Sequence, residues 1–377
     1  MKKIEFFRHN LTKKDVDETN KVMHSIFLTT GPMVDKFEKK FAKYLGIREA
    51  VGLASCTGAL HLALLRHGIG PGDEVITTPM TFVATATAII QAGAVPIFVD
   101  VCPKSGLILP EAVEEAVNKK TKALLPVHLY GRMADMRGFA RLAKQYNLVL
   151  IEDAAHCIEG IRDGVRPGQL SSAACFSFYA TKSMTSGEGG ALVCKSYKDA
   201  KWYRSARHHG ISKNASYRYA KKYRHWDMDF MGWKYNMDDI QAALLINQIE
   251  RLNKYRQKRQ YLENLYRHNL SCIDGLDFME EAGVDEINGH HLFTVLLPEK
   301  ISRDIVMQKL QEKEIGCAVN YRSLHVLRYF RDRFKYEAKD FPNAYMIGKR
   351  TLSLPLYYRL SEQEVEIICN TLKVMIG

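Results

Sequence analysis

The sequence has no long hydrophobic run, no closely spaced cysteine pair and no internal repeat. Its most apolar stretch, residues 82–99, contains Gln91, Gly93 and Pro96, which predict a helix, a turn and a strand rather than a membrane span. The N-terminal residues MKKIEFFRHN lack the apolar core of a signal peptide. The eight cysteines are scattered without zinc-like spacing, which favours reduced structural thiols and no metal site. These absences predict a cytoplasmic protein without a membrane partner.

The charge is unbalanced, with 54 Lys and Arg residues against 42 Asp and Glu residues, a net charge of +12. Such a chain could bind nucleic acid, and it could equally bind a small polyanion such as a nucleotide diphosphate. Residues 208–226 are basic and interleaved with aromatic side chains, a pattern that also suits RNA. Charge alone leaves both partners open.

Short apolar runs alternate with helical patterns between about residues 48 and 195, which predicts a mostly parallel sheet covered by helices on both faces. The last two runs have no helix between them, which allows one of those strands to run antiparallel. The predicted strands are residues 49–55, 74–79, 95–101, 122–129, 148–154, 173–180 and 190–195. The predicted fold class is therefore α/β, a three-layer α/β/α arrangement around a mostly parallel sheet of seven strands.

The length of 377 residues predicts two domains. A long helical pattern over residues 238–270 is apolar in its first half and basic in its second, as expected of a helix that bridges domains. A strand and further helices are predicted after it. We therefore expect an N-terminal arm and a large domain over residues 1–250, and a smaller α+β domain over residues 251–377.

Candidate ligand-binding residues follow the predicted strands, because ligands on an open parallel sheet collect at the carboxyl ends of the strands. Residues 55–58 (SCTG) open a helix after the first strand, where backbone N–H groups and a hydroxyl suit a phosphate. Taken alone, an ordinary Ser or Thr helix cap explains them better. Phe82 follows the second strand, where it could stack on a flat cofactor or pack in the core.

Two ionisable residues lie at the same predicted edge. Asp153 ends the fifth strand, where a carboxylate is costly unless it has a cationic or hydrogen-bonding partner, and a helix cap is the equally good alternative. Lys182 follows the sixth strand, with Ser177 five positions before it. A phosphate cradle, an aromatic plate, a buried carboxylate and a lysine together form the set of groups that pyridoxal phosphate (PLP) needs.

The chain resembles, nearly end to end, the PLP-dependent nucleotide-sugar aminotransferases of the DegT/DnrJ/StrS type, which have the type I aminotransferase fold. The segments that carry the resemblance are GPMVDKFEKKFAKYLG, GIGPGDEVITTPMTFVAT, TKALLPVHLYG, IEDAAH, SFYATKSMTSGEGG and GWKYNMDDIQAALLINQ. The resemblance implies transfer of an amino group from glutamate to a keto sugar linked to a nucleotide. Relatives that dehydrate sugars instead have histidine where this chain has Lys182.

The resemblance also implies roles for the residues around the cofactor ring. Lys182 would form the Schiff base with PLP, and Asp153 would pair with the pyridinium nitrogen. Phe82 would stack on the ring, and His156 would lie against the ring or its hydroxyl.

The implied phosphate contacts come from two subunits. Cys56 (through its backbone), Thr57 and Ser177 would hold the phosphate, and Asn236 would reach the phosphate of the neighbouring subunit. The resemblance therefore implies a homodimer with shared active sites. Asn236 can also be read as a helix-start residue ahead of the Asp238 cap, and the two interpretations are compatible.

The implied substrate contacts are fewer. Tyr321 and His325 correspond to a segment that lines the sugar pocket in family members acting at a 4-keto carbon. Lys221, Lys222 and Arg224 could meet a nucleotide diphosphate, although a solvated loop is the favoured interpretation. The segments EDAAH, GWKYN and GCAVNYRSLHVLRYF most resemble aminotransferases that make UDP-4-amino-4-deoxy-L-arabinose.

Two other functions remain open from the sequence. One is amination of a keto sugar without a nucleotide, such as a cyclitol, and the other is a basic nucleic-acid-binding regulator. A yellow protein whose colour borohydride removes would be the enzyme. A colourless protein with salt-sensitive nucleic-acid binding would be the regulator. We favour the enzyme, without a nucleic-acid partner.

Overall fold

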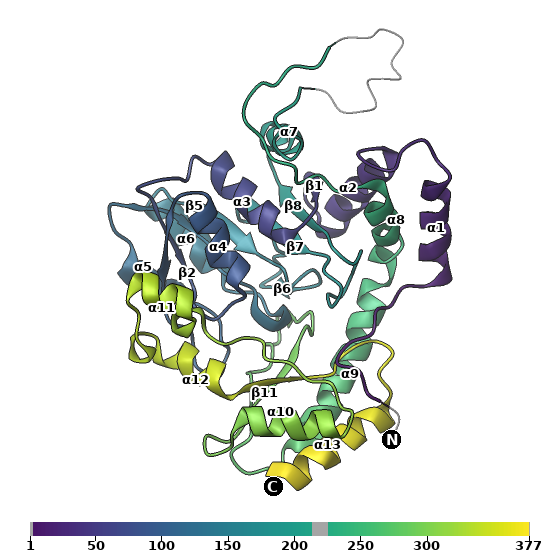
Figure 1. The fold of residues 1–377 in the computed structure, drawn as a ribbon. Coiled ribbons are helices and arrows are strands. Elements are labelled where there is room, and N and C mark those ends of the chain that lie inside the picture. Colours follow the sequence, from purple (N-terminus) through teal and green to yellow (C-terminus); the bar gives the residue numbers. More distant parts are fainter. Residues whose placement is uncertain (1–2, 213–224, 377) are drawn as a thin grey trace.

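The computed structural model describes residues 3–212 and 225–376. Its central sheet has seven strands in the order β1-β8-β7-β5-β4-β2-β3 (Figure 1). The strands are β1 (Glu49–Leu53), β2 (Glu74–Thr77), β3 (Val95–Phe98), β4 (Thr121–Leu124), β5 (Val149–Asp153), β7 (Ala173–Ser177) and β8 (Gly190–Cys194). All seven predicted strands are present, and each ends earlier than predicted, so the predicted α/β class is confirmed.

Strand β8 is the one that runs against the others. It pairs antiparallel with β1 on one side and with β7 on the other, whereas the remaining pairs are parallel. Because β7 and β8 are joined directly by residues 178–189, without a crossover helix, they can lie side by side only in opposite directions. That connection carries Lys182.

Helices cover both faces of the sheet because its buried strands alternate apolar side chains between the two faces. On one face, residues such as Val51, Val75 and Ile151 share a core with α3, α4 and α7. On the other face, Ala50 and Val193 pack against α2 and α8, while neighbouring strands pack against α5 and α6. The helices are α2 (Pro32–Leu45), α3 (Cys56–Arg66), α4 (Val83–Gln91), α5 (Pro110–Ala116), α6 (Met136–Gln145), α7 (Tyr197–Ala206) and α8 (Asp239–Ile246).

A second core lies in the C-terminal part of the chain, around a three-stranded sheet of order β12-β11-β9 (Figure 1). Its elements are α9 (Leu252–Leu270), β9 (Asp277–Phe278), α10 (Arg303–Glu312), β11 (Phe293–Leu296), β12 (Thr351–Leu354) and α13 (Glu362–Ile376). Among the described helices, none has both the length and the apolar character required to cross a bilayer.

Segments from both sides cross the expected domain boundary. Ile4, from the N-terminal end, packs in the C-terminal core and forms a bridge with Ile315. In the other direction, α11 (Arg328–Phe334) and α12 (Pro342–Arg350) contribute Phe330 and Ile347 to a cluster with Phe98 of β3. The boundary at residue 250 stays a prediction.

The long helical pattern over residues 238–270 forms two α-helices instead of one. A short 3-10 turn, η3 (Ile249–Arg251), separates α8 from α9. Just before it, the buried amide of Gln248 donates from Nε2 to the Thr185 carbonyl at 2.7 Å, and its Oε1 accepts from the Thr185 N–H at 3.0 Å. A side chain between α8 and α9 therefore holds the loop that carries Lys182.

Candidate active site

A cavity of about 500 Å³ lies at the carboxyl ends of the strands, a size that falls within the usual range for small-molecule sites. Segments that follow β1, β2, β5 and β7 line it, together with residues from the C-terminal half. It brings together eight of the predicted site residues: Cys56, Thr57, Phe82, Asp153, His156, Ser177, Lys182 and Tyr321.

The carboxylate of Asp153 lies at the end of β5 and is 5% exposed. Thr85 of α4 donates its hydroxyl to Oδ2 at 2.7 Å, and the Ala155 N–H donates to Oδ1 at 3.1 Å. Burial raises the pKa of Asp153, and no cationic side chain of the described residues forms an ion pair with it. No α-helix begins at this residue, so the helix-cap interpretation fails. A buried carboxylate of this kind is suited to receive a positively charged ligand group.

Lys182 lines the same cavity. Burial lowers the pKa of Lys182 to about 8, although the nearby Cys56 and Asp153 oppose the shift. A lysine with this pKa is about one-tenth neutral at pH 7, far more than an ordinary lysine, and nucleophilic attack on a carbonyl requires the neutral amine. The turn that presents it is fixed by a bond from the Lys182 N–H to the Tyr179 carbonyl at 2.9 Å.

The first turn of α3 forms an anion cradle. The Ser55 hydroxyl caps the helix by accepting from the Gly58 N–H at 3.1 Å. Strand β8 passes close to this turn because residue 190 is glycine: a Cβ there would lie 2.3 Å from the Ser55 carbonyl carbon and 2.4 Å from the Cys56 nitrogen. Ser177 of β7 lines the same region. Backbone N–H groups at a helix N-terminus beside a hydroxyl are suited to bind a phosphate.

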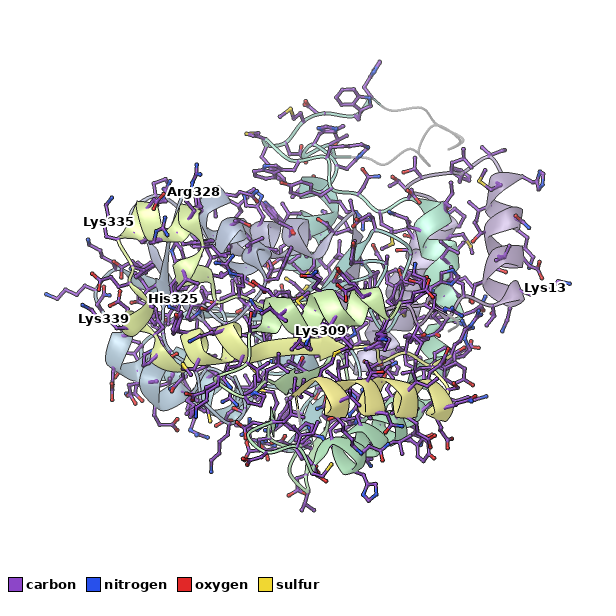
Figure 2. All side chains as sticks on the ribbon, turned by 60° about the horizontal axis from the view of Figure 1, so that its bottom comes forward. Lys13, Lys309, His325, Arg328, Lys335 and Lys339 are labelled. Carbon is purple, nitrogen blue, oxygen red and sulfur yellow. The ribbon has the colours of Figure 1, made fainter. Side chains whose placement is uncertain are left out.

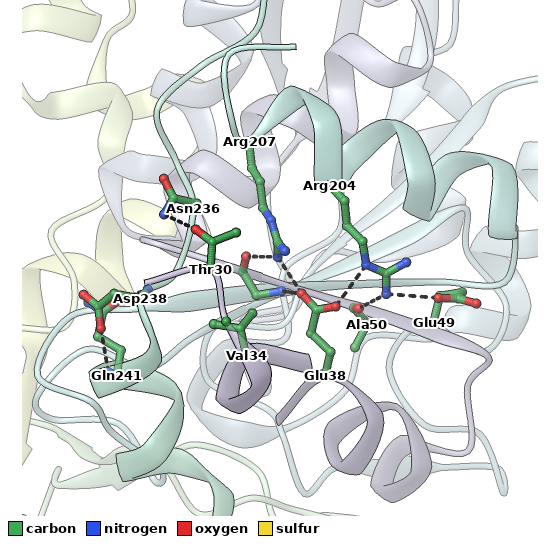
Figure 3. A network of polar contacts seen from close by, with 12 residues as sticks. Thr30, Val34, Glu38, Glu49, Ala50, Arg204, Arg207, Asn236, Asp238 and Gln241 are labelled. Carbon is green, nitrogen blue, oxygen red and sulfur yellow. Dashed lines mark hydrogen bonds and ion pairs between the residues drawn. The ribbon is translucent and has the colours of Figure 1, made fainter. Parts of the chain in front are cut away.

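An ion-pair network anchors the strand that leads into this cradle (Figure 3). Arg207 donates from Nη1 to Glu38 Oε1 at 2.5 Å and to the Gly52 carbonyl at 2.6 Å. The Gly52 N–H in turn donates to Glu38 Oε1 at 2.9 Å. Burial alone would raise the pKa of Glu38, but the charges of Arg207 and Arg204 lower it on balance. The buried ion pair of Arg207 and Glu38 therefore fixes the end of β1.

Aromatic and imidazole rings form a wall of the cavity. His156 Nε2 and the Tyr321 hydroxyl are hydrogen bonded at 2.9 Å, and the two rings stack with 5.7 Å between their centroids. Burial and the charges of Lys182 and His291 lower the pKa of His156 well below its usual value, so the ring is neutral. The Phe82 ring, 54% exposed, lies 5.6 Å from the Tyr321 ring and is free to contact a flat ligand.

Asn236 does not line the cavity of its own chain. Its amide nitrogen donates to the hydroxyls of Thr29 and Thr30 at 3.1 and 3.2 Å, two residues before Asp238 caps α8 (Figure 3). Its backbone forms a bridge with Leu53 at the end of β1, so the residue lies beside the anion cradle. Its contact with a neighbouring subunit stays a prediction.

His325 lies outside the lining of the cavity. The residue is fully buried in η4 (Leu324–Val326), where its ring packs 5.0 Å from Phe341 and 6.5 Å from Tyr345. It is not among the residues that line the cavity, and its contact with the sugar stays a prediction. The neighbouring cations Arg328 and Lys335 instead project outward (Figure 2).

Three further predicted substrate contacts cannot be placed in the site. Lys221, Lys222 and Arg224 lie outside the described residues.

The chain is similar to known proteins over almost its whole length. The sequence profile of the DegT/DnrJ/EryC1/StrS aminotransferase family matches residues 9–373. The chain belongs to this family. The spore coat polysaccharide biosynthesis protein SpsC of Bacillus subtilis (strain 168) is 37% identical over 368 residues, which are 96% of this chain and 94% of that protein.

Solved structures of family members superpose on this aminotransferase over almost its full length. Spr1654 from Streptococcus pneumoniae, in its PMP form, has a TM-score of 0.91 at 27% identity, with 98% of each chain covered. PseC from Helicobacter pylori, an aminotransferase involved in the biosynthesis of pseudoaminic acid, has a TM-score of 0.91 at 25% identity, with 100% of this chain and 99% of PseC covered. The protein is a PLP-dependent sugar aminotransferase.

The residues of this aminotransferase fit the cofactor. Asp153 is a buried carboxylate without a cationic partner among the described residues. A protonated pyridine nitrogen would be such a partner. The cradle at the start of α3 and Lys182, with its lowered pKa, lie in the same cavity. The site therefore provides an anion, a phosphate cradle and an amine at one place.

Sequence reasoning missed a buried hydrogen-bonded pair, His128 and Glu152, that lies next to Asp153. His128 and Glu152 are both fully buried, with 2.7 Å between Nε2 and Oε2. The Ala134 N–H donates to His128 Nδ1 at 3.1 Å, which leaves the proton on Nε2 to donate to Glu152. The His128 N–H also donates to the Asp153 carbonyl at 3.0 Å. The only sequence signal for this pair was one histidine and one glutamate within the predicted apolar strands 122–129 and 148–154.

Proposed function

We propose that this aminotransferase moves an amino group from glutamate to the 4-keto carbon of a nucleotide-linked deoxysugar, in the biosynthesis of a cell-surface polysaccharide such as lipopolysaccharide. The observation that carries the amino transfer is the buried Lys182, with a pKa of about 8, in one cavity with the buried Asp153. The names of SpsC and PseC, which refer to polysaccharide and sugar biosynthesis, support the pathway class. The net charge of +12 suits a nucleotide diphosphate.

The residues around the cavity would hold PLP as follows. The first turn of α3, at Cys56 and Thr57, and the Ser177 hydroxyl bind the phosphate, while Phe82 contacts the ring. The Asp153 carboxylate holds a proton on the ring nitrogen, oriented by its two hydrogen bonds. When bound, PLP supplies an electron sink for the carbanion that forms at the amino-bearing carbon.

Lys182 is the proton carrier in this proposal. Its Nζ, once free and neutral, would move a proton from the amino-bearing carbon of glutamate to the cofactor in the first half-reaction, and from the cofactor to the sugar carbon in the second. A pKa of about 8 suits both directions, because both protonation states are populated near neutral pH. The neutral His156 and the Tyr321 hydroxyl beside it are suited to orient the sugar.

We also infer that the enzyme works as a homodimer in which Asn236 reaches the phosphate of the neighbouring subunit. The position of Asn236 beside the end of β1, outside its own cavity, supports this arrangement.

The proposal is tested with a Lys182→Ala variant and a Lys195→Ala control. Lys195 is exposed after β8 and does not line the cavity. Wild type and control are expected to be yellow, to lose the colour with borohydride and to aminate a keto sugar from glutamate. The Lys182→Ala variant is expected to show neither property. Transamination by this variant at the wild-type rate would contradict the proposal.

The substrate is identified by incubating the enzyme with glutamate and a set of keto compounds, with the products analysed by mass spectrometry and NMR. The set contains nucleotide-linked 4-keto sugars and a keto cyclitol without a nucleotide. Amination of the cyclitol alone would refute the nucleotide-linked substrate while leaving the aminotransferase assignment intact.

A further inference from the structure

A segment of the C-terminal half, residues 288–292, reaches the active-site cavity and places His291 in its wall. The His291 side chain is 4% exposed. Its ring packs edge-on against His156, with 5.1 Å between the ring centroids and an angle of 87° between the planes. His291 therefore lies beside the ring that is bonded to Tyr321 and lines the same cavity as Lys182.

The segment before His291 is fixed from two sides. Arg259 of α9 donates from Nη2 to the Gly289 carbonyl at 2.8 Å and to Glu159 at 2.6 Å, and from Nε to the His290 carbonyl at 3.1 Å. On the other side, the Gly289 N–H donates to the Gly131 carbonyl at 2.8 Å. A Cβ at residue 131 would lie 2.8 Å from the His290 nitrogen, so glycine is required for this close contact. These contacts on both sides of the segment therefore fix the backbone position of His291.

The two adjacent histidines have different surroundings. His290 Nδ1 is hydrogen bonded to Glu263 Oε2 at 2.8 Å, and His290 does not line the cavity. In contrast, His291 Nε2 is buried and has no hydrogen-bond partner among the described residues. A buried polar group without a partner is costly, and because His291 lines the cavity, a ligand bound there would complete its hydrogen bonding.

The charge state of His291 indicates the kind of ligand. Burial, together with the charges of Lys182 and Arg259, lowers the pKa of His291 well below its usual value. The adjacent His156 is neutral for the same reason. A neutral imidazole offers one donor and one acceptor, which match a hydroxyl or carbonyl oxygen of a sugar. It offers no positive charge to a carboxylate of glutamate.

We propose that His291 binds an uncharged oxygen of the keto sugar and is a specificity-determining residue of the sugar half-reaction. Arg259 is the positioning residue that holds its segment. This inference rests on the proposed function, because it assigns the contact to the sugar and not to the amino donor.

The test measures the two half-reactions separately on the holoenzyme. The variants are His291→Leu, His291→Gln and the adjacent control His290→Asn, chosen because asparagine tolerates the positive φ of 49° at residue 290. The first half-reaction uses glutamate alone and is monitored by the loss of the yellow colour. The second half-reaction uses a UDP-linked 4-keto pentose or a thymidine-diphosphate-linked 4-keto deoxyhexose. It is monitored by the return of the yellow colour.

His291→Leu is expected to lower kcat/KM of the sugar half-reaction about 10- to 100-fold, while the glutamate half-reaction changes less than about threefold. His291→Gln keeps a donor and an acceptor and should lie between this variant and wild type. His290→Asn should match wild type in both half-reactions.

The inference is overturned if His291→Leu slows both half-reactions equally, since that is the signature of a structural defect, or if it leaves the sugar half-reaction unchanged. Should the leucine variant not fold, an unchanged sugar half-reaction in His291→Gln overturns the inference. A wild-type enzyme that reacts with glutamate but with neither nucleotide sugar refutes the proposed substrate class, and the inference fails with it.

Discussion

The hydroxyl of Thr85 is expected to control how tightly this enzyme binds its cofactor. Thr85 is fully buried on α4 and donates to Asp153 Oδ2 at 2.7 Å. The Thr81 hydroxyl lies 2.7 Å from the Thr85 oxygen. Because the single hydroxyl hydrogen of Thr85 is used on the carboxylate, Thr81 must donate to Thr85. The two hydroxyls therefore form a directed chain that ends on the anion proposed to hold the ring nitrogen of PLP.

Replacing Thr85 with valine removes the donor and nearly preserves the shape. A hydrogen bond to a charged group contributes about 1.5–3 kcal/mol, and about 1.4 kcal/mol corresponds to a factor of ten in affinity. Burial already raises the pKa of Asp153, and loss of the hydroxyl raises it further, so the carboxylate holds a positive ring nitrogen less well. We expect Thr85→Val to weaken PLP binding about 10- to 100-fold.

The assay is a titration of cofactor-free protein with PLP at fixed pH, in which the absorbance of the bound cofactor measures binding. Thr87→Val is the matched control, because Thr87 lies on the same helix and its hydroxyl donates only to the Ala84 carbonyl, at 3.3 Å. The control should bind PLP like wild type. A Thr85→Val protein with a Kd within about twofold of wild type would refute the role assigned to the Asp153 carboxylate.

Two other predictions concern Lys182 and the dimer. Lys182→Met should stabilise the cofactor-free protein at pH 7 by up to about 3 kcal/mol, since burial lowers the pKa from 10.5 to about 8. This gain in the free energy of unfolding should shrink between pH 8 and pH 10, because the native lysine loses its proton there while the unfolded lysine keeps it. Urea unfolding at several pH values measures the gain, and a gain that does not change with pH would contradict the prediction. Mixed Lys182→Ala and Asn236→Ala subunits should be more active than either variant alone, and no recovery after dissociation and remixing would exclude shared sites.

Much of the fold could be predicted because its signals are local. Each strand of the central sheet is a short apolar run bounded by polar residues, and the missing helix between the last two runs correctly allowed the reversal at β8. The prediction of one continuous helix over residues 238–270 was wrong. Its periodicity continues through Gln248, but the bonds of that side chain to Thr185 belong to the tertiary structure.

The sequence by itself determined the sheet edge of the site. Lys182 and Asp153 each follow an apolar strand, and strand direction alone places such residues at a common edge. Only the tertiary structure decided which residues from the C-terminal half meet that edge. It placed His291 in the cavity beside Tyr321, which only the family resemblance had indicated, and enclosed His325 in an aromatic cluster a few residues away. These positions depend on packing between segments far apart in the chain, for which a single sequence has no periodic signal.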